Sequence, residues 1–130
     1  MLAVAWPIDH TYVGMRIVVI EDHQDTAELM HEILRDAGHD VRVAFSGSDG
    51  IDAARTLAAE VVLCDVGLPD IDGYEVARRL RADRATAGAR LVALTGFDGE
   101  EELRKARDAG FDRHVVKPID PFQLESLLRK

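Results

Sequence analysis

The chain has 130 residues, 47% of them hydrophobic and 31% charged, and it carries a formal net charge of -8. This length and balance are typical of one globular domain with its own core. The negative charge argues against direct binding of nucleic acid, whose phosphates attract basic surfaces. The single cysteine excludes an internal disulfide and suits a reducing compartment, so we expect a cytoplasmic protein. No apolar run reaches the roughly 20 residues that span a bilayer, so membrane insertion is not expected.

Residues 1–14 form a predicted leader or linker ahead of a domain that we place at residues 15–130. The leader lacks the basic start and the long apolar stretch of a signal peptide. A linker remnant, a short ordered arm and vector-derived sequence all stay open as its origin, and Met15 is an alternative start.

From Gly14 onward a short apolar run, a polar turn and an amphipathic segment alternate five times. The apolar runs are rich in Val and Leu, which suit strands. The predicted strands are residues 16–20, 40–44, 61–64, 90–94 and 113–116. The segments that follow them repeat apolar residues at intervals of three and four, which predicts a helix after each strand.

The predicted helices are marked by their apolar positions and their ends. In chain order the apolar positions are Ala27, Met30, Ile33, Leu34 and Ala37; Ile51, Ala54, Leu57 and Ala58; Tyr74, Ala77 and Leu80; Leu103 and Ala106; and Phe122, Leu124, Leu127 and Leu128. Gly38 and Gly110 are expected to end the first and fourth helices. Asp120, Pro121 and Gln123 form a helix start signal for the last one. The arginines of the third helix are expected to lie in water.

Five βα units predict an α/β domain with a five-stranded parallel sheet and helices on both faces, because parallel strands need helical crossovers. The strands at 16–20 and 61–64 are continuously apolar and are expected at the centre of the sheet. The strand at 40–44 alternates apolar and polar residues, which suits a position nearer an edge.

Polar residues follow four of the five predicted strands at the point where each strand ends. Glu21 and Asp22 follow the first, Asp65 the third, Thr95 the fourth and Lys117 the fifth. Ligands of open parallel sheets bind beyond the carboxyl ends of the strands. We therefore expect three carboxylates, a hydroxyl and an ammonium to meet at one edge of the sheet.

This set of groups indicates phosphoryl chemistry. Three neighbouring carboxylates repel one another and need a cation or raised pKa values, and hard oxygen ligands on short loops suit Mg²⁺. A lysine charge and a threonine hydroxyl can both serve a phosphoryl group. A carboxylate can itself attack phosphorus and form an aspartyl phosphate. Phosphoryl transfer depends mainly on positioning and neutralised charge, which this set provides.

The stretches VVIEDH, CDVGLPDIDG, LTG and VVKP resemble the four motifs of response regulator receiver domains, the CheY-like phosphoacceptor modules of two-component systems. Motif order and spacing are intact from about Met15 to the C-terminus. The resemblance implies a flavodoxin-like (βα)5 fold with strand order 2-1-3-4-5. It implies a signalling phosphoacceptor rather than an enzyme, a monomer or weak dimer, with a histidine kinase or a histidine phosphotransfer protein as its partner.

The resemblance also assigns the acceptor and a metal site. Asp65 accepts a phosphoryl group from the phosphohistidine of a sensor kinase. Asp22 and Asp65 bind Mg²⁺ directly, together with the backbone carbonyl of Gly67, and Glu21 contributes through a metal-bound water.

A switch is implied as well, formed on the fourth and fifth βα units. Thr95 senses the phosphoryl oxygen, and Lys117, set by a cis bond to Pro118, pairs with the phosphate. His114 stands where the family usually carries a tyrosine or phenylalanine that swings inward on activation. Strand alternation turns His114 away from Lys117, toward the helix around 100–109. A moving ring and a fixed, partly exposed ring stay open for His114.

Two other classes of function compete with this interpretation. A phosphohydrolase with an aspartyl nucleophile commonly has a second acid two residues later, where this chain has Gly67, and it needs a substrate-binding cap. A degenerate receiver used only for binding would lack an acid, the threonine or the lysine, and all of these are present. The sequence leaves open whether the chain is a single-domain regulator or a receiver from a hybrid histidine kinase.

Overall fold

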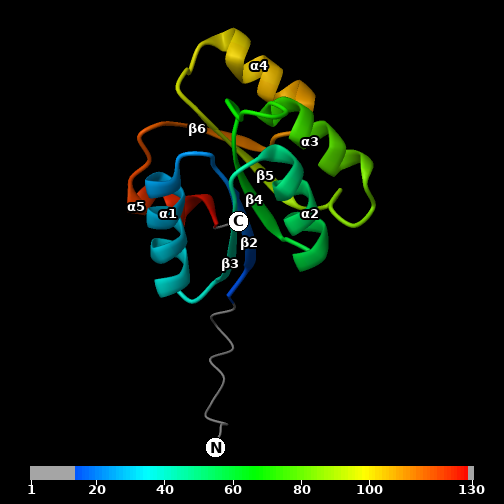
Figure 1. Cartoon of the computed structure of the whole chain (residues 1–130). Helices are drawn as coiled ribbons and strands as arrows, with labels where there is room; N and C mark the ends of the chain where they lie inside the picture. Colours follow the sequence, from blue (N-terminus) through cyan, green and yellow to red (C-terminus); the bar gives the residue numbers. More distant parts are fainter. Residues whose placement is uncertain (1–13, 129–130) are drawn as a thin grey trace, which may run out of the picture.

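Five parallel strands form one central sheet (Figure 1). The computed structural model describes residues 14–128, so the predicted leader lies outside the described residues except for Gly14. The strands are β2 (Arg16–Ile20), β3 (Asp40–Ala44), β4 (Val61–Asp65), β5 (Arg90–Thr95) and β6 (Arg113–Val116). Their order, β3-β2-β4-β5-β6, confirms the predicted order 2-1-3-4-5.

Helices cover both faces of this sheet. They are α1 (Gln24–Asp36), α2 (Gly47–Leu57), α3 (Gly73–Ala82), α4 (Glu100–Ala109) and α5 (Pro121–Leu127). Helices α1 and α5 lie on one face, and α2, α3 and α4 lie on the other (Figure 1). The predicted α/β layering is therefore confirmed. Within residues 14–128 no helix has the length and apolar character needed to cross a membrane.

The central strand β4 is buried on both faces, as its continuous apolar sequence predicts. Val62 and Cys64 join the core beneath α2, α3 and α4, whereas Val61 and Leu63 join the core beneath α1 and α5. The sheet continues one residue beyond the predicted strand end, because Asp65 still pairs with β5. A fully buried strand thus ends directly in a carboxylate.

The helix ends sort charge along the sheet. Each helix begins at the edge where the strands end and returns antiparallel to them, as the βα connections require. The first turns of α1 to α4 contain the acids Asp25, Asp49, Glu75, Glu100, Glu101 and Glu102, and their last turns contain Arg35, Arg55, Arg79, Arg81 and Arg107. These signs complement the helix dipoles. Acids therefore gather at the carboxyl edge of the sheet and arginines at its amino edge.

The last helix begins as predicted. The Asp120 side chain accepts a hydrogen bond from the Gln123 amide, and the Gln123 side chain accepts one from the Asp120 amide. Together with Pro121 in the first turn, this capping box fixes the start of α5 directly after the loop that carries Lys117.

The prediction that Ala58 lies on the apolar face of the second helix is wrong. Ala58 is the C-cap of α2, with a left-handed φ of 55°, and it is exposed. This conformation ends the helix at Leu57 and turns the chain, so Ala59 enters the core instead. The helical spacing could not show that the helix stops one residue earlier.

The expectation that the arginines of the third helix lie in water is wrong for Arg81. Its guanidinium donates to the carbonyls of Ala87, Ala89 and Gly110 at 2.7, 2.6 and 2.9 Å and pairs with Asp112 at 2.8 Å. Arg78 and Arg79 do lie at the surface, where both pair with Glu75. The difference is that the last turn of α3 lies against the α3–β5 and α4–β6 loops, whose carbonyls need donors.

Helix α4 is anchored more weakly than the others. Ala106 is buried as predicted, but Leu103 is only partly buried, and Ala109 is the second buried anchor.

Tyr74, expected inside, is also half-buried, and its hydroxyl donates to Glu102 across the α3–α4 contact at 3.2 Å. In α5, Phe122 is 85% exposed, because the capping turn directs it outward from the core residues Leu124 and Leu127.

Candidate functional site

The polar residues predicted to meet do lie together at the carboxyl edge of the sheet. Glu21 and Asp22 follow β2, Asp65 is the last residue of β4, and Lys117 follows β6. The three acids each place a carboxylate oxygen within 4.8 Å of the other two. Glu21 is 1% exposed and Asp65 is 8% exposed, whereas Asp22 is open to solvent.

Lys117 holds two of these acids. Its ammonium lies 2.7 Å from Glu21 Oε1 and 3.1 Å from Asp65 Oδ2. Burial acts to lower the pKa of Lys117, but the hydrogen bond that its ammonium donates to Glu21 and the attraction of Asp65 outweigh it, so its pKa is raised. The ammonium therefore stays charged and brings the ends of β2, β4 and β6 together.

Glu21 is a buried acid with few neighbours to satisfy it. Burial raises its pKa, opposed by the hydrogen bond from Lys117 and one from the His23 amide at 3.1 Å. The negative charge of Asp65 raises it further. A cation close to these acids would favour the charged form of Glu21. The surroundings of Glu21 therefore suit a bound cation.

Backbone geometry orients the Asp65 carboxylate. The Gly67 amide donates to Asp65 Oδ1 at 3.0 Å while Lys117 contacts Oδ2. A Cβ built at Gly67 would meet only Asp65 Oδ1, at 3.8 Å, so the space beside the Asp65 carboxylate is open among the described residues. Gly73 does the opposite: a Cβ there would lie 2.6 Å from the Asp65 carbonyl oxygen, so only glycine lets the start of α3 approach β4 this closely.

Thr95 is at the same edge but is turned into the β5–α4 loop. Its hydroxyl donates to the Phe97 carbonyl at 3.2 Å and accepts from the Phe97 amide at 3.1 Å. The Lys117 amide donates to the Thr95 carbonyl at 2.8 Å, which links the two loops through the backbone. The peptide bond from Lys117 to Pro118 is cis, as the resemblance implies.

His114 faces α4, on the side of β6 predicted from strand alternation. It lines a cavity of about 120 Å³ together with Leu103, Ala106 and Phe111. Its Nε2 is the one buried side-chain nitrogen or oxygen within residues 14–128 that has no hydrogen-bond partner. The ring of His114 therefore lies between β6 and the partly buried face of α4.

Comparison with known proteins shows the family to which the chain belongs. The family model for the response regulator receiver domain matches residues 17–129. The chain belongs to the response regulator receiver domain family. The receiver is 30% identical over 120 residues to an uncharacterised 14.6 kDa protein of Leptolyngbya boryana, covering 92% of both chains. It is 35% identical over 114 residues to the DNA-binding response regulator MtrA of Mycolicibacterium smegmatis, covering 88% of this chain and 49% of that one.

Among solved structures, the receiver resembles the receiver domain of the sensor histidine kinase PA1611 from Pseudomonas aeruginosa PAO1. The TM-score is 0.81 at 25% identity, covering 89% of this chain and 95% of that one. That structure is described as having a magnesium ion coordinated in its active site cleft. This receiver spans about half the length of MtrA.

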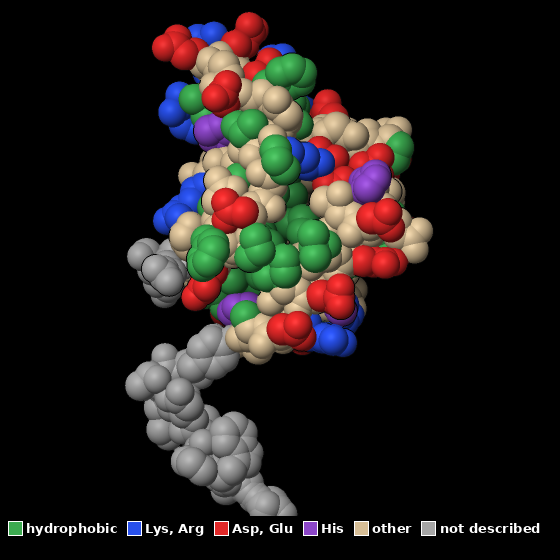
Figure 2. All heavy atoms as spheres, turned by 90° about the vertical axis from the view of Figure 1, so that its left-hand side faces the viewer, with side chains coloured by type: hydrophobic (Ala, Val, Ile, Leu, Met, Phe, Trp, Pro, Cys, Tyr) green, Lys and Arg blue, Asp and Glu red, His purple; other side chains and the backbone are tan. Residues whose placement is uncertain are grey.

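An apolar groove borders the site on the face that carries α1 and α5, where Figure 2 shows hydrophobic side chains gathered. The groove has a volume of about 390 Å³, and Leu29, Met30, Ile33 and Ile119 line it next to Lys117. Leu29 is 55% exposed. A contiguous apolar surface beside a reactive group is typical of a contact surface for another protein.

Asp70 is a positioning residue that the sequence analysis missed. Its carboxylate accepts from the amides of Gly47 and Ser48 at 2.7 and 2.9 Å and from the Ser48 hydroxyl at 2.8 Å. These bonds, led by the Ser48 amide, hold the pKa of Asp70 well below its usual range. They tie the loop that follows Asp65 to the start of α2. The sequence signal was present: residues 46–50 leave helix-start amides in need of an acceptor.

The Asp70 contacts predict a pH-dependent stability difference. Since the pKa of Asp70 is lower in the folded chain than its ordinary 3.8, its carboxylate stabilises the fold fully above about pH 4. That contribution is lost as the pH falls through the lower folded value. Asp70→Asn should therefore be less stable than wild type at pH 7, and the difference should shrink below about pH 4.

Urea unfolding at several pH values measures this difference. Asp36→Asn, at the exposed end of α1, is the matched control and should show little difference at any pH. A stability gap for Asp70→Asn that stays constant down to pH 2 would contradict the assigned contacts.

Proposed function

We propose that the receiver takes a phosphoryl group onto Asp65 from the phosphohistidine of a sensor kinase or a histidine phosphotransfer protein. The observation that carries this proposal is the Lys117 ammonium, 3.1 Å from Asp65 and 2.7 Å from Glu21, within a cluster of three carboxylates. One cation bound to two acids leaves net negative charge at the site, which favours a further cation and then a phosphoryl group between them.

In the proposed reaction an oxygen of Asp65 attacks phosphorus. An O–P bond forms, the P–N bond to the donor imidazole breaks, and the electron pair returns to that nitrogen, which leaves as neutral imidazole after taking up a proton from solvent. Lys117 is already in contact with the acceptor and offsets the charge on the transferred group. The Gly67 amide holds the carboxylate in place, so little reorganisation is needed.

The donor set fits Mg²⁺. Three carboxylates with oxygens within 4.8 Å of one another are hard ligands, and one of them, Asp22, is exposed. We assign Asp22 and Asp65 as direct ligands with the Gly67 carbonyl, and Glu21 as a ligand through water. When bound, the ion would neutralise charge on the phosphoryl oxygens. A magnesium ion described in the PA1611 receiver supports this assignment.

The same proposal gives Thr95 and His114 roles in the switch. The Thr95 hydroxyl is held by Phe97 in the β5–α4 loop, and turning it toward the phosphoryl group would pull on that loop. His114 lies in the adjacent cavity against α4 with its Nε2 unsatisfied. The surface of the fourth and fifth βα units is then the part that changes.

The apolar groove beside Lys117 supports a protein as the phosphodonor. Lys117, whose ammonium lies 3.1 Å from Asp65, is one of its lining residues, and the exposed Leu29 offers apolar contact. In this proposal the receiver transforms no separate substrate and catalyses only its own phosphorylation and slow dephosphorylation. The cytoplasmic location, the monomeric or weakly dimeric state and the 15–130 domain boundary stay predictions.

Asp65→Asn should abolish phosphorylation, because an amide is a poor nucleophile and a poor ligand. Wild type incubated with Mg²⁺ and acetyl phosphate should gain one acid-stable, base-labile phosphoryl group, read by intact mass. Asp36→Asn should label like wild type, and a chelator should stop labelling. Equal labelling of Asp65→Asn would reject Asp65 as the acceptor.

Asp22→Asn should weaken Mg²⁺ binding more than Glu21→Gln, although each removes one negative charge. Loss of an outer-shell group costs about 10–100-fold in metal affinity, and loss of a direct ligand should exceed it. Titrating Mg²⁺ while following the Gly67 amide resonance measures both affinities. The reverse order would mean that the roles of the two acids are exchanged.

Beryllofluoride, a phosphoryl mimic, should shift the His114 ring resonances. The expected cause is that α4 and the ring rearrange together and the buried Nε2 gains a partner or solvent. His39, whose ring accepts from the Met15 amide at the opposite edge of the sheet, is the internal control and should not shift. Unchanged His114 resonances with saturating beryllofluoride would leave His114 as a fixed ring.

A further inference from the structure

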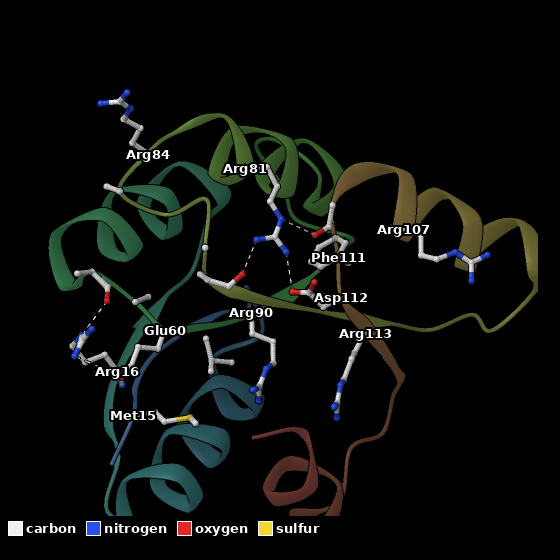
Figure 3. Close-up of a pocket in the computed structure, with 17 residues that line it drawn as sticks. Met15, Arg16, Glu60, Arg81, Arg84, Arg90, Arg107, Phe111, Asp112 and Arg113 are labelled. Carbon is white, nitrogen blue, oxygen red and sulfur yellow. Dashed lines mark hydrogen bonds and ion pairs between the residues drawn. The ribbon is translucent and has the colours of Figure 1, made fainter. Parts of the chain in front are cut away.

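A hollow lined by arginines lies at the amino edge of the sheet, opposite the edge that carries Asp65 (Figure 3). Its volume is about 1040 Å³. Its six arginines are Arg16, Arg81, Arg84, Arg90, Arg107 and Arg113, and we call this surface the basic hollow. Three of them are the first residues of β2, β5 and β6, and the others come from the end of α3, the segment after it and the last turn of α4. The fold gathers residues that are dispersed along the sequence.

The charge of the basic hollow is opposite in sign to the net charge of the chain. Among residues 14–128, six guanidinium groups and two carboxylates, Glu60 and Asp112, line the hollow, so these lining residues carry a charge of +4. The chain as a whole carries -8, so the remainder carries -12. The six arginines are spread over residues 16–113 of the sequence, and the fold brings them to one surface.

Three of these arginines form hydrogen bonds and ion pairs that stabilise the fold. Arg81 donates to three backbone carbonyls and pairs with Asp112, as the dashed lines in Figure 3 show in part. Arg16 donates to the Ala58 carbonyl and pairs with Glu60, and Arg90 donates to the Leu127 carbonyl.

The other half, Arg84, Arg107 and Arg113, have no hydrogen bond or ion pair with any residue from 14 to 128, and all three are exposed. Arg84 points outward at the rim, whereas Arg107 projects from α4 and Arg113 from the start of β6 (Figure 3). Like charges held in one hollow repel one another, and a bound anionic ligand would replace this repulsion with attraction. The fold itself does not require these three groups to be charged.

We propose that the basic hollow binds an acidic segment of a partner polypeptide. Guanidinium groups pair with carboxylates through two parallel hydrogen bonds, and three such groups are available. Exposed small residues, Ala58, Ala85 and Gly88, leave room beside them for an extended backbone. A nucleic acid would run beyond the hollow onto a surface carrying net negative charge, whereas a short acidic segment fits within it. Because the hollow is at the opposite edge from Asp65, the segment can bind without displacing a phosphodonor.

The test uses the whole chain and a fluorescein-labelled twelve-residue peptide of alternating Glu and Ala, followed by anisotropy at low ionic strength. Arg107→Gln/Arg113→Gln should raise its Kd about tenfold, which corresponds to about 0.7 kcal/mol for each of two exposed ion pairs, within their usual range. The matched control is Arg42→Gln/Arg78→Gln, which removes the same charge from exposed positions outside the hollow and should change Kd less than twofold.

Any of the following results would overturn the proposal. One is equal weakening by the two double variants, or no binding of the peptide to wild type. Another is tighter binding of a labelled single-stranded DNA 12-mer that the hollow variant loses, which would make the ligand a nucleic acid. The third is self-association of the wild type in sedimentation, lost in the hollow variant, without peptide binding, which would make the occupant a second copy. Acetyl phosphate labelling of Asp65 should be unchanged in both double variants, so failure here is separate from failure of the phosphoacceptor proposal.

Discussion

The ion pairs of Lys117 with Glu21 and Asp65 are the interaction on which the carboxyl edge of the sheet depends. They join the ends of three strands that are up to 96 residues apart in the chain. Glu21 is nearly inaccessible to solvent, and an acid in that position needs a cation or a proton. The lysine that makes the edge stable is also the group that would face an incoming phosphoryl group. Stability and reactivity therefore depend on the same three side chains, so a substitution that increases one is expected to decrease the other.

The fold and the edge of the sheet could be predicted because each rests on a short, repeated signal. Buried strands such as β4 are continuously apolar, and helical crossovers force their carboxyl ends to one edge. From the strand positions, topology alone predicts that Glu21, Asp22, Asp65 and Lys117 meet, and it places Thr95 at the same edge. The direction of His114 away from Lys117 followed from strand alternation in the same way.

What the sequence could not predict depends on contacts between segments that are far apart or on the backbone conformation of one residue. Ala58 continues the helical spacing of α2, yet a left-handed turn at that residue ends the helix. Arg81 looks like its neighbours on α3, but carbonyls from two other segments surround it. Asp70 acts on amides more than 20 residues upstream. The six arginines of the basic hollow never form a run, so composition and local charge both conceal them.

The sorting of charge along the helices has an effect at distances beyond any contact. Acids at the helix starts and arginines at the helix ends give the molecule an electric dipole roughly parallel to the strands. In the field of a charged partner such a dipole experiences a torque, so the receiver would rotate before it docks. Within about 10 Å at moderate salt that rotation would present the arginine end to an anionic surface and the acidic end to a cationic one. Productive encounters would then be selected by orientation first and by surface shape afterwards.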